Sequence, residues 1–108
     1  MNAVTETPLV FLADWRSAVA HSPEGPQPQF LIDGPDIKLI LAGLEQGQRL
    51  PPHPENQAVY HFLEGAGTMT VNGESFAVKP GSTVITPPGA TRGLVAESHL
   101  SFLAVKSA

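Results

Sequence analysis

The feature that most constrains the fold of this chain is the pair Asn72–Gly73, which separates two short runs of alternating residues, GTMTV and ESFAV. Both central positions of a two-residue hairpin turn favour a positive φ angle, which Asn and Gly adopt at little cost. The pair therefore predicts an antiparallel β-hairpin over residues 67–78.

Turn residues recur at near-regular spacing along most of the chain, and strand-like runs lie between them, at 29–33, 36–47, 58–65, 79–90 and 99–105. The 10 glycines and 11 prolines among 108 residues exceed the average share of about 12%. Because 42% of the residues are apolar, this surplus indicates tight turns rather than disorder. We expect an all-β protein of about eight strands, folded as an antiparallel sandwich or barrel.

The first 29 residues differ from the rest, and we interpret them as an N-terminal arm. Residues 1–8 are polar, residues 9–12 form a strand-like apolar run, and Asp14 is an N-cap candidate for a short helical turn over residues 15–21. The length predicts a single domain over 1–108, with its barrel core at about 30–106.

Composition argues against several classes of function. The absence of cysteine excludes disulfides and thiol chemistry, and a net charge of −4 with six scattered Lys and Arg argues against nucleic-acid binding. No apolar run approaches the ~18 residues that a membrane span needs. We expect a cytoplasmic protein with neither a nucleic-acid nor a membrane partner.

The stretch GQRLPPHPENQAVYHFLEGAG, residues 47–67, carries the candidate metal ligands. His53 and Glu55 share one face if the segment is extended, and imidazole with carboxylate suits Fe, Mn, Ni or Zn. A third ligand, His61, requires a strand register that turns it inward. Otherwise His53 and Glu55 are a polar pair at the rim of the barrel.

The spacing Gly47-x5-His53, closing at Gly65, together with Gly81, Pro87 and Gly89, resembles the two motifs of the cupin superfamily. The resemblance covers about residues 38–105 and implies a jelly-roll barrel that forms a homodimer. In the arm, the apolar side chains of Leu9, Phe11 and Trp15 are then candidates for the dimer contact.

The chain departs from the metal-binding members of that superfamily at most ligand positions. Glu55 replaces the second histidine, Gln57 or Ala58 the glutamate, and Arg92 the histidine of the second motif. Only His53 remains of four ligands. A guanidinium cannot bind a cation and instead attracts carboxylate or phosphate.

Arg92 leaves three alternatives open. It recognises an anionic ligand, it turns outward to a glutamate at the rim, or it points inward and forms a bridge to Glu55 in place of the metal.

Two functions follow from these residues, and a purely structural dimer without a ligand is a third, weaker possibility. The first is a module that binds a small polar or anionic molecule in the central pocket through Arg92, Tyr60, Gln57 and Glu55, with an atypical metal site or none. The alternative is a metal-dependent enzyme, resembling the dioxygenase or isomerase members, that uses His53, Glu55 and His61. The sequence does not decide whether the protein is catalytic.

Overall fold

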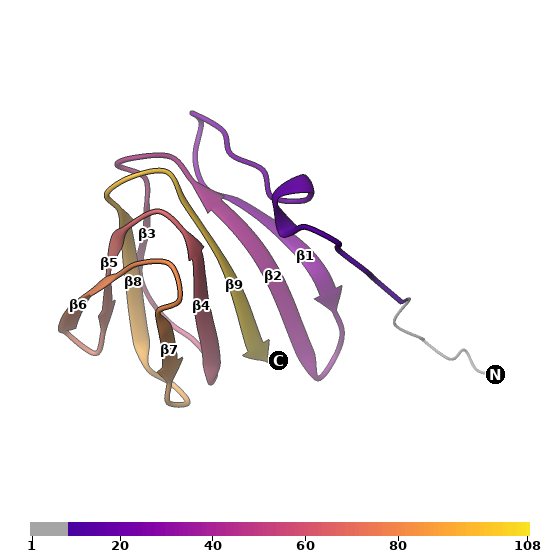
Figure 1. The fold of residues 1–108 in the computed structure, drawn as a ribbon. Coiled ribbons are helices and arrows are strands. Elements are labelled where there is room, and N and C mark those ends of the chain that lie inside the picture. Colours follow the sequence, from indigo (N-terminus) through magenta and orange to yellow (C-terminus); the bar gives the residue numbers. More distant parts are fainter. Residues whose placement is uncertain (1–8) are drawn as a thin grey trace.

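The computed structural model describes residues 9–108, so residues 1–8 of the expected arm lie outside the described part. Within this described part, nine strands and one short 3₁₀-helix follow one another (Figure 1): η1 (Trp15–Ser17), β1 (Gln27–Asp33), β2 (Ile37–Leu44), β3 (Arg49–Pro54), β4 (Ala58–Glu64), β5 (Gly67–Val71), β6 (Glu74–Val78), β7 (Thr83–Thr86), β8 (Thr91–Ala96) and β9 (Leu100–Ser107). No helix within residues 9–108 is long and apolar enough to cross a membrane.

The strands form two antiparallel sheets, whose strands can be followed in Figure 1. One sheet has the order β1-β2-β9-β4-β7 and the other the order β3-β8-β5-β6. Neighbouring strands are often distant in sequence, as in a jelly roll, because the chain passes back and forth between the sheets. The expected all-β jelly-roll fold with a short N-terminal helical turn is thus confirmed.

The core lies between the inner faces of the two sheets, and β4 shows how alternation builds it. Ala58, Tyr60 and Phe62 are buried there, whereas Val59 and His61, one residue out of phase, are exposed. The opposite sheet supplies Met69 and Leu94 to the same core. The period-2 pattern of the sequence therefore decides which side chains reach the interior.

The Asn72–Gly73 hairpin forms as the sequence predicts. Asn72 and Gly73 have φ angles of 51° and 84°, and the strands on either side, β5 and β6, pair with Val71 opposite Glu74.

The arm crosses the outer face of the β1-β2-β9-β4-β7 sheet, and its helix is shorter than expected. Asp14 is the N-cap, and its side chain accepts a hydrogen bond from the backbone of Arg16, but the helix spans only Trp15–Ser17. Contacts with the sheet hold the chain that follows: His21 Nε2 lies 3.0 Å from the carbonyl oxygen of Leu100. These contacts outweigh the helical pattern of residues 18–21, and the apolar run 9–12 pairs with no strand among the described residues.

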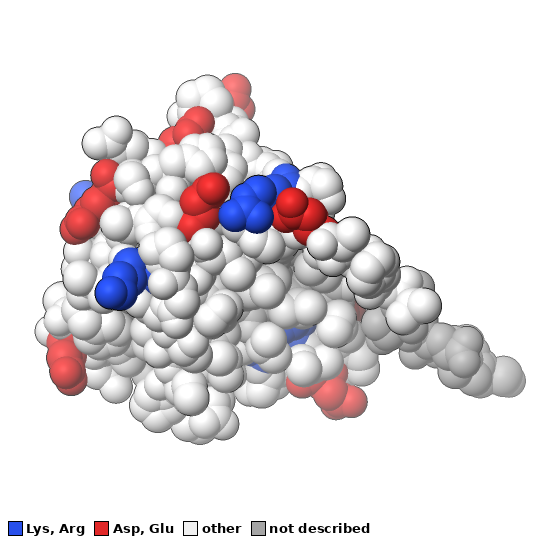
Figure 2. All heavy atoms as spheres, in the orientation of Figure 1, with Lys and Arg blue, Asp and Glu red and all other residues white. Residues whose placement is uncertain are grey.

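Charged side chains are sparse on the face shown in Figure 2 and stand singly or in small mixed groups. That face carries no continuous basic patch of the kind that follows a phosphate backbone.

Candidate functional site

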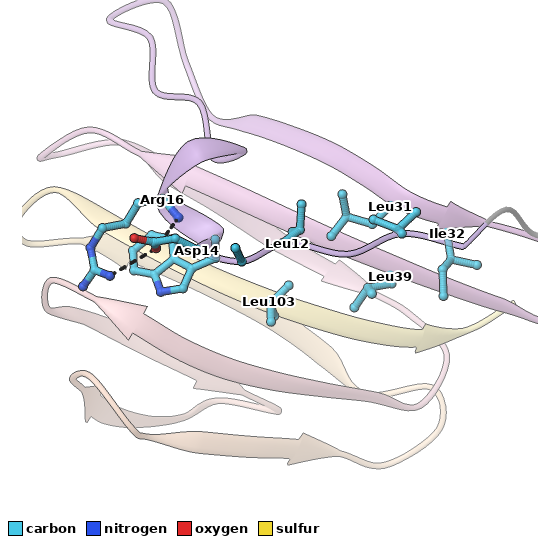
Figure 3. Close-up of a pocket in the computed structure, with 10 residues that line it drawn as sticks. Leu12, Asp14, Arg16, Leu31, Ile32, Leu39 and Leu103 are labelled. Atoms are coloured by element: carbon cyan, nitrogen blue, oxygen red, sulfur yellow. Dashed lines mark hydrogen bonds and ion pairs between the residues drawn. The ribbon is translucent and has the colours of Figure 1, made fainter.

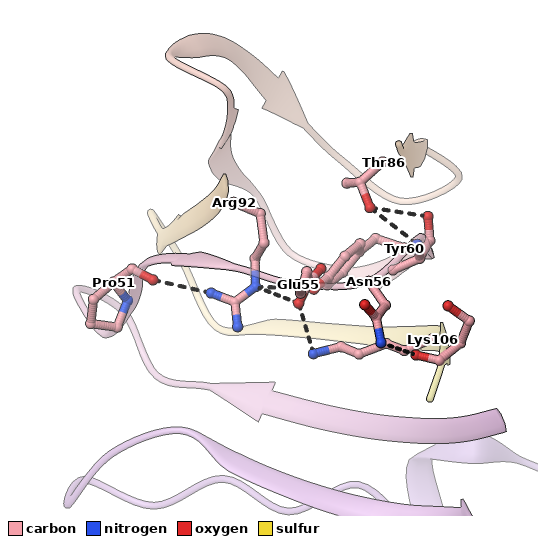
Figure 4. Close-up of polar contacts among 9 residues, drawn as sticks. Pro51, Glu55, Asn56, Tyr60, Thr86, Arg92 and Lys106 are labelled. Carbon is pink, nitrogen blue, oxygen red and sulfur yellow. Dashed lines mark hydrogen bonds and ion pairs between the residues drawn. The ribbon is translucent and has the colours of Figure 1, made fainter. Parts of the chain in front are cut away.

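A buried ionic cluster lies at one end of the barrel and centres on the carboxylate of Glu55 (Figure 4). The Tyr60 hydroxyl donates a hydrogen bond of 2.6 Å to Glu55 Oε2. Lys106 Nζ and Arg92 Nε lie 3.0 and 3.3 Å from the other oxygen, Oε1. We call these four residues, Glu55, Tyr60, Arg92 and Lys106, the mouth cluster.

The mouth cluster is largely removed from water. The side chains of Glu55, Arg92 and Lys106 are 8%, 11% and 22% exposed, and Tyr60 is buried. Glu55 Oε1 is itself buried and accepts no well-aligned hydrogen bond, although both cations lie within ion-pair distance of it. Its stabilisation therefore comes from charge more than from directed hydrogen bonds.

The backbone around Glu55 is fixed by the turn that precedes β8. The amide of Glu55 donates to the carbonyl oxygen of Ala90 at 3.1 Å, and the amide of Gly89 donates to the carbonyl oxygen of Glu55 at 2.9 Å. Gly89, one of the glycines of the second motif, thus acts on the site through the main chain, because its amide holds the backbone of Glu55 in place.

Arg92 points into the barrel because β8 alternates. Leu94 and Ala96 continue its phase and are buried. Its Nε donates to the Tyr60 hydroxyl oxygen at 3.0 Å, and its Nη1 donates to the carbonyl oxygen of Pro51 at 3.1 Å. The structure therefore excludes the outward alternative and shows the bridge to Glu55, and Arg92 also lines the cavity, where it can contact a ligand.

The prolines of β3 explain how the Pro51 carbonyl oxygen can bind the Arg92 side chain while β3 remains part of the sheet. Because β3 is an edge strand, its prolines leave no ladder hydrogen bond unmade inside the sheet. The register between β3 and β8 shifts between Leu50 and His53. Pro51 lies within this irregular part of the ladder, and its carbonyl oxygen accepts a hydrogen bond from the side chain of Arg92.

A cavity of about 340 Å³ opens beside the mouth cluster. Three members of the cluster, Tyr60, Arg92 and Lys106, form part of its wall. The remainder is apolar and comes from the segment leading into β1 and from β1, β2, β3 and β9: Pro26, Pro28, Phe30, Ile40, Ala42, Leu50, Phe102 and Ala104. Glu55 is not a wall residue and contacts the wall through its three partners.

Burial raises the pKa of the Tyr60 phenol well above its ordinary value of 10.0, and the neighbouring Glu55 carboxylate raises it further. Arg92 opposes this shift but does not cancel it. Tyr60 therefore stays protonated at neutral pH and serves as a hydrogen-bond donor to Glu55 and an acceptor from Arg92.

The structure does not bring the three candidate metal ligands together. His53 is exposed and lies opposite Arg92 in the β3–β8 ladder. His61 is exposed on the outer face of β4, where its Nδ1 lies 2.8 Å from Thr83 Oγ1. Within residues 9–108 no three His, Asp or Glu side chains converge in a way that suits an ion.

The mouth cluster itself does not fit a divalent cation either. Glu55 is already shared by two cationic side chains, and Arg92 and Lys106 would repel a metal ion at this distance. No step of a metal-dependent reaction can therefore be assigned to these residues.

The sequence predicts that Gln57 binds the ligand, whereas the structure places it outside the wall of the barrel cavity. Its side chain is exposed, and its backbone carbonyl accepts from the amide of Ser107 at 3.0 Å.

Lys106 is the one member of the mouth cluster that the sequence analysis missed. It continues the inward phase of β9 after Phe102 and Ala104. The alternation of β9 predicts this inward position, but a lysine near the end of a strand is ordinarily exposed to solvent.

A second, wider cavity of about 650 Å³ lies between the arm and the outer face of the first sheet (Figure 3). Its wall is mostly aliphatic, with Leu12, Leu39 and Leu103 among its residues, and Asp14 and Arg16 form an ion pair of 3.3 Å there. It shares no residue with the barrel cavity.

Comparison with known proteins adds a family to this geometry. The sequence profile of the family described as "Cupin domain" matches residues 40–106, which include β4 through β8 and the whole mouth cluster. A protein from Methanocaldococcus jannaschii, itself uncharacterised, is 44% identical over 39 residues. That match spans 36% of this chain and 31% of the relative, about a third of the relative's length.

Two solved structures have closely similar folds. A conserved protein of unknown function from Streptococcus pyogenes superposes with a TM-score of 0.83 at 21% identity, over 99% of this chain and 95% of its own. A cupin superfamily protein from Desulfitobacterium hafniense gives 0.84 at 12% identity, over 97% and 98%. At these identities the likeness concerns the fold alone.

Proposed function

This chain belongs to the cupin domain family, and from that premise we propose that its barrel cavity binds a small anionic molecule through Arg92, Lys106 and Tyr60, without a catalytic metal ion. The observation that carries the proposal is the charge of the mouth cluster. Two cationic side chains, Arg92 and Lys106, form part of the cavity wall, and the carboxylate of Glu55 pairs with both. The cluster therefore keeps an excess of one positive charge, in a chain whose net charge is −4.

Burial makes that excess charge effective. Arg92 and Lys106 lie in a partly enclosed apolar cavity, where attraction for an anion is screened less than at an open surface. The planar guanidinium of Arg92 matches the geometry of carboxylate and phosphate oxygens. Tyr60 and Glu55 orient it, because the phenol oxygen accepts from Nε and the carboxylate lies 3.3 Å away.

Thermal unfolding in the presence of small organic anions and their uncharged analogues tests this proposal. A ligand that binds only the folded state raises stability by about 2.7 kcal/mol at 100 times its Kd. We expect anions to raise the Tm of the wild-type protein and uncharged analogues not to, and we expect Lys106→Met to weaken the effect. Equal shifts from charged and uncharged compounds, or no shift from any anion, would contradict the proposal.

The metal-dependent alternative requires His53, Glu55 and His61 to converge on one ion. The orientation of His61 and the pairing of Glu55 with two cations argue against it. Metal analysis of protein purified without an affinity tag, beside His53→Ala, separates the two functions. Stoichiometric metal that disappears in the variant would favour the enzyme.

A further inference from the structure

The wall of the barrel cavity is more specific than a general anion site, because its charge and its apolar surface are separated. The charged and hydroxyl groups, from Tyr60, Arg92 and Lys106, belong to the mouth cluster, and the other eight wall residues are apolar. A ligand that carries polar groups along its length would bury them against this apolar surface without partners, at a cost in free energy. The cavity therefore suits a ligand with one polar end.

The charge of the mouth cluster sets the charge of that end. Arg92 and Lys106 contribute two positive charges and Glu55 one negative charge, while Tyr60 is neutral. One negative charge on the ligand brings the cluster to neutrality. A second would be left without a compensating cation in the cavity, because no wall residue other than Arg92 and Lys106 is basic.

The donors that remain suit a carboxylate. Nε and Nη1 of Arg92 donate to Tyr60 and Pro51, while its Nη2 makes no hydrogen bond within residues 9–108. Lys106 Nζ forms an ion pair with Glu55 and lies 5.9 Å from the centroid of the Tyr60 ring, and neither contact uses all three of its N–H donors. Two donors, one from β8 and one from β9, thus remain for the two oxygens of a carboxylate.

The apolar part of the wall indicates the rest of the ligand. The ring of Phe102 lies 5.7 Å from that of Tyr60, and Phe30 is 51% exposed where it contributes to the wall. Two aromatic side chains in the wall of one cavity, one partly exposed and one buried, offer their rings to a flat or branched apolar body. At about 340 Å³ the cavity is near the lower end of the ~300–1,000 Å³ range of ligand sites.

We infer that the ligand is a monocarboxylate on a compact apolar body, such as an arylcarboxylate or a branched-chain carboxylate. Its carboxylate binds between Arg92 Nη2 and Lys106 Nζ, and its body packs between Phe30, Phe102 and Leu50. This inference rests on the proposed function and narrows it to one ligand class. Glu55 acts as a positioning residue, because it lies outside the cavity wall and holds the groups that bind.

Isothermal titration calorimetry of the wild-type protein with a matched series of probes tests the inference. The series consists of benzoate, benzamide, acetate, phthalate and inorganic phosphate. We expect benzoate to bind at least ten-fold more tightly than benzamide, which lacks the charge, and than acetate, which lacks the ring. Phthalate, which is a dianion at neutral pH, and phosphate, which is mostly a dianion at alkaline pH, should bind more weakly than benzoate.

The pattern of failure separates this inference from the proposed function. If acetate or phosphate binds as tightly as benzoate, the proposal of anion binding stands, but the inference that the ligand has an apolar body is wrong. If benzamide equals benzoate, or if no probe binds, both the inference and the proposed function are overturned.

Two variants test the charge count independently. Lys106→Met makes the cluster neutral and should weaken the binding of benzoate at least ten-fold, with little change in the affinity for benzamide. Glu55→Gln removes the one negative charge of the cluster and leaves the two cations unbalanced, so the affinity for phthalate should increase relative to that for benzoate. An unchanged ratio of phthalate to benzoate in folded Glu55→Gln protein would overturn the single-charge argument. The wild-type series remains decisive if either variant fails to fold.

Discussion

At the scale of single residues, Glu55 determines the chemistry of the barrel mouth. It is a buried carboxylate that one phenol and two cations share. Replacing a whole buried ion pair with apolar groups is often tolerated, but removing one partner leaves a buried charge uncompensated, at a cost of about 3–5 kcal/mol. Within the mouth cluster, Glu55 therefore stabilises the two buried cationic side chains, which in turn are the groups proposed to bind the ligand.

Titration of the Tyr60 phenol measures this environment directly, because Tyr60 is the one tyrosine in the chain. Its pKa is raised above the ordinary 10.0, so above pH 10 the folded state holds a proton that the unfolded state releases. The free energy of unfolding should then fall as pH rises beyond about 10, by at most about 1.4 kcal/mol per pH unit. The near-ultraviolet absorbance of phenolate follows the titration itself.

The control for this titration is the same protein in denaturant, where Tyr60 should ionise near 10.0. Tyr60→Phe should abolish the absorbance change and remove its share of the pH dependence. A native phenol that titrates at its ordinary value would show that Tyr60 is neither buried nor bound to Glu55 as described.

At the scale of elements, the arm and the sheet beneath it meet at Gly43. A Cβ atom at this position would lie 2.2 Å from the carbonyl oxygen of Ala20 and 2.7 Å from Cε1 of His21. The absence of a side chain on β2 is therefore what allows the arm to lie against the sheet. The side-chain amide of Gln48 secures the same segment by donating to the carbonyl oxygen of Ser22 at 2.7 Å.

Gly43→Ala should therefore detach or displace the arm. We expect a loss of about 1–3 kcal/mol in the free energy of unfolding, as for other overpacked contacts, and faster proteolysis between residues 9 and 26. Denaturant unfolding and limited proteolysis measure the two effects.

Gly93→Ala is a matched control for this substitution. Gly93 also lies in a strand and is buried, but a Cβ there would meet its neighbours at 3.5 Å, an ordinary contact distance. Equal destabilisation by both variants would mean that the arm contact is not the cause.

Local chemistry explains which elements the sequence predicts well. The turn at Asn72–Gly73 needs only two residues with positive φ, and alternation alone identifies the inward side of β4 and β8. The arm helix is overestimated because its end depends on distant contacts, such as that of His21 with Leu100. The partners of Arg92 and the inward position of Lys106 also depend on strand order, which no local pattern contains.

At the scale of the whole molecule, a row of aliphatic side chains crosses the outer face of the first sheet. Strand register places Ile85 opposite Val59, Val59 opposite Val105, and Val105 opposite Leu39. Ile85 is 65% exposed, and in the arm Leu9 and Phe11 are 97% and 82% exposed. Contiguous apolar surface of this kind is typical of an interface.

We predict that two copies of the chain associate through this face. Ile85→Glu should weaken the homodimer at least ten-fold, which corresponds to about 1.4 kcal/mol, because the charge would have to be buried without a partner. Sedimentation velocity over a range of concentrations measures the change. Ala77→Glu, at an exposed position on the edge strand of the other sheet, should leave the association unchanged. A wild-type protein that stays monomeric at every concentration would rule the interface out.

The mouth cluster also bears on how this barrel can change over evolutionary time. Its members come from the turn after β3 and from β4, β8 and β9, so they belong to both sheets and are contributed by separate segments of the chain. Loss of Glu55 leaves two cations uncompensated, whereas loss of Lys106 leaves a matched pair. Because the four residues contact one another, the effects of successive substitutions should be strongly non-additive. A lineage that lost one of these residues would gain little until a second changed with it. The order in which mutations arise, more than their separate effects, then decides which ligands descendants of this chain can acquire.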